Sequence, residues 1–148
     1  MREENMDRLN DAIERLDGAD AHPVVSIDLF LAGNDDPASI GPNLEPHPGV
    51  RAFERVLKDI RDRQEVSDVV VQIDEGIEGE WPFASAVYVT TAATPEEVHR
   101  WAAELQPDEY VGEADAIGPW LGGGKPPGAP DVPEGHRVVT LYWDKGVR

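Results

Sequence analysis

The sequence predicts an α+β protein on a ferredoxin-like split β-α-β (βαββαβ) plan. This plan has a four-stranded antiparallel sheet, two helices on one face and an additional N-terminal helix. Apolar residues recur at helical spacing in some segments and at alternating spacing in others. After a leading helix, these segments follow in the order strand, helix, strand, strand, helix, strand. The right-handed crossover rule then places the first and third strands at the centre of the sheet.

The leading helix is predicted over residues 5–17, within an N-terminal segment 1–20. Gly18 provides its C-terminal stop. Its apolar stripe consists of Met6, Leu9, Ile13 and Leu16. The first strand is predicted over residues 22–32, because Val25, Ile27, Leu29 and Leu31 alternate there.

The remaining elements follow from the same two periodicities. A helix over residues 50–63 has apolar residues at i, i+3, i+4 and i+7. Strands at 68–74 and 86–91 form a hairpin, and a last strand occupies 137–144. Thr94-Pro95-Glu96-Glu97 is a capping box that starts another helix. Residues 107–135 form a long loop rich in Gly and Pro.

Length and composition limit the class of protein. A chain of 148 residues with 40% hydrophobic content fits one packed domain over residues 1–148. The absence of cysteine excludes disulfides and thiolate chemistry, which favours a cytoplasmic location. The charged start Met1-Arg2-Glu3-Glu4 predicts no signal peptide. No apolar run approaches the roughly 18–20 residues of a membrane span, so no membrane partner is expected.

The net charge of −17 is the strongest compositional signal. It argues against nucleic acid as a partner, because such binding depends on Lys and Arg neutralising phosphates. A basic protein or a cation would be attracted and steered. Adaptation of composition or simple solubility explains the charge equally well, so the charge alone does not identify a partner.

The predicted topology brings the loops 33–49, 75–84 and 107–135 to one edge of the sheet. We take this edge as the candidate binding site. Its candidate residues are Asp35, Asp36, His47, Glu75, Glu78, Glu80, Trp81, Phe83 and Trp120. Carboxylates beside a histidine can bind a hard cation or perform acid–base chemistry, although solvated loop acids are ordinary in so acidic a chain.

The sequence lacks the motifs of common catalytic and metal sites. It contains neither a calcium-loop spacing nor His-Glu-x-x-His, so no metal or cofactor is predicted. It contains no Gly-x-Ser-x-Gly elbow, and Gly122-Gly123-Gly124-Lys125 is followed by prolines rather than by a phosphate-loop hydroxyl. His47, just ahead of a helix, is the best catalytic candidate among the four histidines.

Several short stretches resemble those of a known group of proteins. These are Gly33-Asn34-Asp35-Asp36, Ser39 to Leu44, His47-Pro48-Gly49 and Trp81-Pro82-Phe83. Across residues 24–144 the chain resembles an uncharacterised family of conserved hypothetical proteins from GC-rich bacteria. The resemblance implies no activity and no catalytic residue. The general type, a small acidic α+β protein, is similar to immunity proteins that neutralise toxins.

Two classes of function are predicted for the loop edge. The first is a non-enzymatic module, immunity-like or regulatory, that binds a basic protein. In it Trp81, Phe83 and Trp120 are the anchors, and Glu75, Glu78 and Glu80 steer the partner. The alternative is a small hydrolase or isomerase in which Asp35 or Asp36 pairs with His47. A third possibility is a small-molecule binder that uses the second face of the sheet.

That second face carries Val70, Tyr88, Val138 and Tyr142, a larger apolar patch than a monomer usually exposes. Either the leading helix covers it, or it pairs with its equivalent in a two-fold homodimer. The frequency of two-fold dimers favours the second arrangement.

Overall fold

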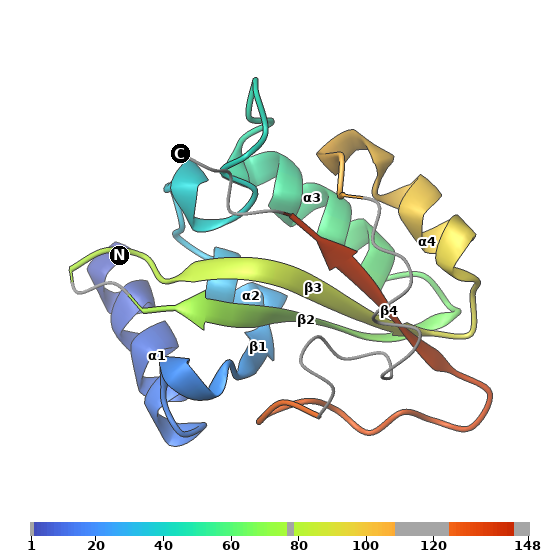
Figure 1. Cartoon of the computed structure of the whole chain (residues 1–148), viewed down its shortest axis with the longest axis horizontal. Coiled ribbons are helices and arrows are strands. Elements are labelled where there is room, and N and C mark those ends of the chain that lie inside the picture. The colour runs from blue at the N-terminus through green and yellow to red at the C-terminus, as the bar shows by residue number, and fades with distance from the viewer. Residues whose placement is uncertain (1, 77–78, 109–124, 144–148) are drawn as a thin grey trace.

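The computed structural model describes residues 2–76, 79–108 and 125–143 (Figure 1). It has the predicted α+β class, with an N-terminal helix and a four-stranded antiparallel sheet. The elements in chain order are α1 (Arg2–Arg15), η1 (Ala19–Ala21), β1 (Val24–Ser26), α2 (Ile27–Leu31), η2 (Pro37–Ser39), α3 (Val50–Arg61), β2 (Val66–Glu75), β3 (Phe83–Thr91), α4 (Pro95–Trp101), η3 (Ala103–Leu105) and β4 (Arg137–Tyr142).

The order of strands across the sheet differs from the predicted one. The sheet runs β1-β2-β3-β4, and every neighbouring pair is antiparallel. The ferredoxin-like plan has the first and third strands at the centre, whereas β2 and β3 occupy the centre here. This part of the prediction was wrong because hydrophobic periodicity identifies strands but not their partners. The β2–β3 hairpin was predicted, and it pairs Val70 with Tyr88 and Val71 with Val87.

The segment predicted as one long first strand divides into a strand and a helix. β1 ends at Ser26, whose Oγ accepts a hydrogen bond from the backbone N–H of Leu29 at 3.1 Å and thereby caps α2. Ile27, Phe30 and Leu31 are then buried at i, i+3 and i+4. A short apolar run fits a strand and a helix equally well, and the serine cap selects the helix here.

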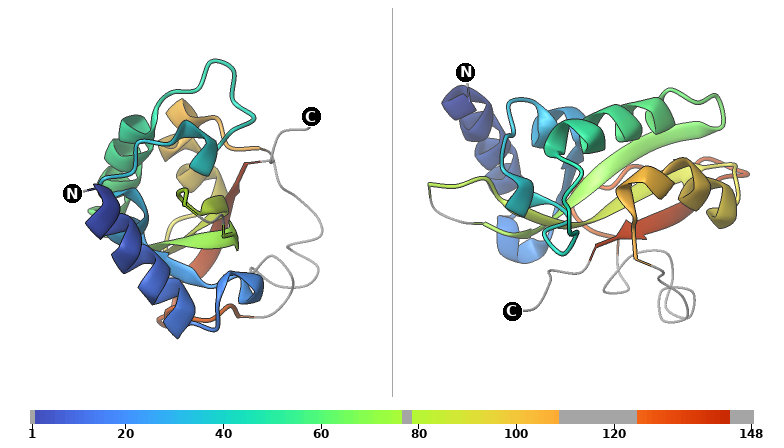
Figure 2. Two further views of the ribbon diagram at one scale, coloured as in Figure 1. Left: turned by 90° about the vertical axis from the view of Figure 1, so that its left-hand side faces the viewer. Right: turned by 90° about the horizontal axis from the view of Figure 1, so that it is seen from above.

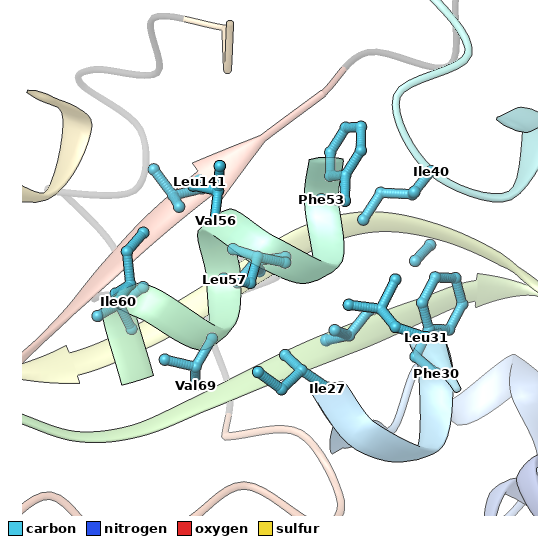
Figure 3. Close-up of a cluster of buried hydrophobic side chains, with 14 of the residues drawn as sticks. Ile27, Phe30, Leu31, Ile40, Phe53, Val56, Leu57, Ile60, Val69 and Leu141 are labelled. Atoms are coloured by element: carbon cyan, nitrogen blue, oxygen red, sulfur yellow. The ribbon is translucent and has the colours of Figure 1, made fainter. Parts of the chain in front are cut away.

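The main core lies between one face of the sheet and the helices. α3 contributes Phe53, Leu57 and Ile60 to it, all 1% exposed or less. These side chains meet Ile27 and Phe30 of α2 in the close-up of Figure 3. α3 and α4 lie over the same face of the sheet in Figure 2. The leading helix joins this core through Leu9 and Ile13.

The second face of the sheet has a smaller cluster of Val24, Val70 and Tyr88, against which Ala129 and Val138 pack. A turn over residues 126–129, closed by a 3.1 Å hydrogen bond from Ala129 N–H to the carbonyl of Pro126, lies at this cluster. α1 contributes to the opposite core, so of the two predicted alternatives the one in which it covers the second face was wrong. The two-fold homodimer stays a prediction.

The same turn is joined to the edge of the sheet. Val24 N–H donates to the Pro127 carbonyl at 2.9 Å, which gives the outer edge of β1 a partner. Gly128 has a φ of +86°, and a Cβ at this position would lie 2.6 Å from the Val24 carbonyl oxygen. Glycine is therefore required both for the backbone conformation and for the close approach.

Candidate functional site

Two of the three loops predicted to converge do meet at one end of the sheet. Residue Ile40 forms an isolated parallel bridge with Ala84 at the start of β3. The indole N–H of Trp81 donates to the Phe30 carbonyl at 2.8 Å, which ties the segment before β3 to α2. Loops 33–49 and 75–84 therefore form one edge.

Of the third loop, residues 107–135, the described start lies at this edge. Asp108 N–H donates to the Tyr142 carbonyl at 2.7 Å, at the end of β4. β4 begins at the opposite end of the sheet, where Arg137 pairs with Thr91. The predicted convergence at the start of the last strand was wrong, because it followed from the ferredoxin-like strand order.

The two described aromatic candidates at this edge are buried. Trp81 is 1% exposed and Phe83 is 6% exposed. The Phe30 carbonyl receives a second hydrogen bond from Asn34 Nδ2 at 3.2 Å, so Trp81 belongs to a packed junction rather than to an open surface. Neither side chain is accessible as an anchor for a partner. Glu78 and Trp120 lie outside the described residues.

Asp35 and Asp36 hold the same junction together. Arg2 Nε donates to Asp35 Oδ1 at 2.8 Å, and this hydrogen bond holds the pKa of the Asp35 carboxyl below its usual range. The Arg2 guanidinium also lies 5.5 Å from the ring centroid of Trp81. Asp36 caps η2 by accepting a 3.0 Å hydrogen bond from Ala38 N–H. The two carboxylates therefore fix α1 and η2 in place.

His47 is held by backbone groups. Its Nδ1 accepts a hydrogen bond from Gly49 N–H at 2.8 Å, so the proton resides on Nε2, which donates to the Ile40 carbonyl at 2.8 Å. The ring packs against Phe53 with centroids 5.5 Å apart. Both ring nitrogens are occupied, so the predicted carboxylate–His47 pair does not form among the described residues. Among all the described residues, no three His, Asp or Glu side chains lie close enough together to hold a metal ion.

Glu75 and Glu80 are exposed near the tip of the β2–β3 hairpin, beside α1 (Figure 1). The exposed side of α1 carries a row of acids, which we call the acidic row: Glu3, Asp7, Asp11 and Glu14. At 100° per residue they fall within about 80° of the helix circumference, turned away from the buried Leu9 and Ile13. None of the four forms an ion pair within the described residues.

An open groove of about 760 Å³ lies between residues 33–37 and the N-terminal half of α3. One wall carries a row of cations, Arg51, Arg55 and Lys58, which we call the cationic row. This row was not predicted, because acids far outnumber cations in the sequence and dominate its charge pattern. The available signal was the i, i+4, i+7 spacing of these cations on the exposed side of a strongly amphipathic helix.

Fold and site together define a small acidic α+β protein with a helix-covered antiparallel meander, a row of acids on its leading helix and a polar groove beside α3. The chain belongs to the Uncharacterized protein YfbO family, whose model matches residues 4–141. It is 34% identical over 125 residues to the Uncharacterized protein YfbO of Escherichia coli (strain K12), covering 82% of this chain and 83% of that protein.

These comparisons confirm the predicted membership of an uncharacterised family, while its association with GC-rich bacteria stays a prediction. No solved structure matches the chain. Within the described residues, none of the helices has the length and apolar character needed to cross a membrane.

Proposed function

We propose that this protein is a non-enzymatic binding protein that holds a basic protein partner on the acidic row of α1, together with Glu75 and Glu80. An immunity-like or regulatory role is the concrete form of this proposal. The observation that carries it is the acidic row itself: four like charges on one exposed side of a helix, without ion pairs in the described part of the chain.

Fold stability explains only part of the acidic row, because Asp11 has arginines at i−3 and i+4 (Arg8 and Arg15), whereas the row also contains like-charge pairs. Like charges at i, i+4, as in Glu3–Asp7 and Asp7–Asp11, destabilise a helix by about 0.2–0.5 kcal/mol per pair. Only Glu3, in the first turn, gains from the helix dipole. A basic partner would relieve this repulsion, and the net charge of −17 would speed its approach.

The test compares two variants with equal charge changes. The row variant combines Glu3→Gln, Asp7→Asn, Asp11→Asn and Glu14→Gln. The control variant combines Glu45→Gln, Asp59→Asn, Glu96→Gln and Glu134→Gln, which replace exposed acids on other elements. Each affinity-tagged full-length chain is expressed in the source cells, and the co-purified proteins are quantified at about 50 and 300 mM salt.

We expect a basic protein that co-purifies with the wild-type chain and the control variant. Its recovery should fall at least tenfold with the row variant and also at high salt. The row variant should unfold at the same or a higher urea concentration than wild type, because repulsion has been removed. Equal recovery with both variants, or the absence of any salt-sensitive basic partner, would overturn the proposal.

A further inference from the structure

We propose that the groove beside α3 binds a small molecule that carries an oxyanion, a carboxylate or a phosphate, on an apolar body. The groove lies on a different helix from the acidic row, so this site is independent of the proposed protein partner. Three properties of its lining support it: shape, charge and an available donor.

The shape suits a small ligand. A volume of about 760 Å³ lies within the roughly 300–1,000 Å³ that is usual for such sites. Leu31, Val50 and Pro37 are the larger apolar residues of its lining; Leu31 and Val50 are 2% and 7% exposed, so Pro37, which is exposed, is the accessible apolar side chain of the three. Asn34 fixes the loop wall, because its amide donates to Ser39 Oγ at 2.9 Å and accepts from Asp36 N–H at 2.9 Å.

The charge of the lining is opposite in sign to that of the whole chain. The cationic row supplies three positive side chains along one helix face, in a protein with 30 acids and 13 basic residues. Two acids also line the groove, and two of the three cations of the row are themselves paired with acids: Lys58 with Glu54, and Arg55 with Glu104. Asp35 is bound by Arg2 at 2.8 Å, and Glu54 is bound by Lys58 at 3.1 Å. Within the described residues, a negative group entering the groove therefore meets one cation without an acidic partner, Arg51.

Arg51 is the available donor. Its side chain is exposed, and it forms neither an ion pair nor a side-chain hydrogen bond within the described residues. A guanidinium presents parallel N–H groups that match the two oxygens of a carboxylate or a phosphate. Arg55 is partly engaged by Glu104, so it adds positive charge but has fewer free donors. Arg51 is thus assigned the direct contact.

The ligand must be small rather than polymeric. A nucleic acid or another polyanion would extend beyond the groove and meet the field of a protein with a net charge of −17. A single oxyanion needs only the guanidinium of Arg51, and its apolar body can lie against the exposed Pro37. One accessible cation within an overall negative surface selects for a single negatively charged group on a compact molecule.

The test is a titration of the ¹⁵N-labelled full-length protein, followed by NMR, with inorganic phosphate and separately with butyrate at low ionic strength. We expect saturable shifts of the amides of Gly49, Val50 and Arg51, with a Kd of about 1–10 mM for such minimal probes. Butyrate should also shift Leu31. Saturation by phosphate alone supports a phosphate ligand, and saturation by butyrate alone supports a carboxylate.

Two variants with the same charge change make the test specific. Arg51→Gln should weaken binding about tenfold, whereas Arg137→Gln, at an exposed position on β4, should leave it unchanged. The row variant of α1 should also bind the probes like wild type, which separates this site from the protein-partner proposal. Linear shifts without saturation up to about 50 mM, or equal weakening by both arginine variants, would overturn the assignment.

Discussion

The Phe30 carbonyl lies at the end of α2 and receives two side-chain hydrogen bonds, from Trp81 Nε1 at 2.8 Å and from Asn34 Nδ2 at 3.2 Å. Both donors belong to buried side chains, which are 1% and 8% exposed. We predict that Trp81→Phe and Asn34→Ala destabilise the protein cooperatively. Either single change leaves the carbonyl with one donor, whereas the double change leaves it with neither side-chain donor.

The magnitudes follow from this geometry. Trp81→Phe removes one hydrogen bond, about 1 kcal/mol, and leaves a smaller ring in the core, about 1–2 kcal/mol more. Asn34→Ala should cost about 1–3 kcal/mol, because its bonds to Ser39 and Asp36 are lost as well. In the double variant the buried carbonyl also carries a desolvation penalty, so the total should exceed the sum of the single effects by about 1–2 kcal/mol.

The assay is equilibrium urea unfolding of the full-length chain, followed by far-ultraviolet circular dichroism. Sodium sulfate, which strengthens apolar burial, keeps the double variant folded without urea. The matched control is Trp101→Phe combined with Asn34→Ala, because Trp101 on α4 packs against Arg63 instead. This pair should be additive within about 0.5 kcal/mol. Equally additive behaviour of the Trp81 pair would refute the shared-carbonyl account.

Three further predictions test single features. Ser26→Ala should lower the free energy of unfolding by about 0.5–2 kcal/mol through loss of the α2 cap, and Ser26→Gly by only a few tenths; equal losses in urea unfolding would contradict this. Gly128→Ala should cost more than Gly135→Ala, because both have positive φ but only a Cβ at 128 meets a backbone carbonyl, at 2.6 Å; equal unfolding midpoints would exclude this contact. The backbone N–H and hydroxyl of Thr94 lower the pKa of Glu97, so a ¹³C NMR titration should place its midpoint below 4.5. Its stabilising effect should be present above pH 4.5 and disappear as the pH falls through that lower midpoint; a midpoint at or above 4.5 would contradict the capping role.

The longer elements could be predicted from the sequence because their signals are redundant. α3 combines five buried residues at helical spacing, and its predicted start at Val50 is confirmed. The Thr94–Glu97 capping box is also confirmed, with both of its hydrogen bonds formed. β1 and α2 are too short for such redundancy. Three strand residues and five helical residues share one apolar run, and a single serine cap separates them.

The candidate site was harder to predict than the fold. The sequence predicts Trp81 as an anchor because aromatic residues carry much of the binding energy of interfaces, but its indole N–H has a buried carbonyl partner that no sequence pattern reveals. The partners of His47 were equally hidden in the sequence, since both of its ring nitrogens form hydrogen bonds with backbone groups of its own loop. For Arg51 the difficulty was different. The helical spacing of Arg51, Arg55 and Lys58 is visible in the sequence, but these cations line a groove only because residues 33–37 lie beside α3.

The bond between Val24 and Pro127 affects how the chain emerges from the ribosome. β1 is made early, but the residue that closes its outer edge is added roughly a hundred residues later, about 5–20 s at usual synthesis rates. During that interval the strand presents an unsatisfied edge, the feature by which nascent chains mispair and aggregate. A chain that terminates after α4 would lack both this closure and β4. Truncated products of this gene should therefore depend on chaperones and proteases in a way that the finished protein does not.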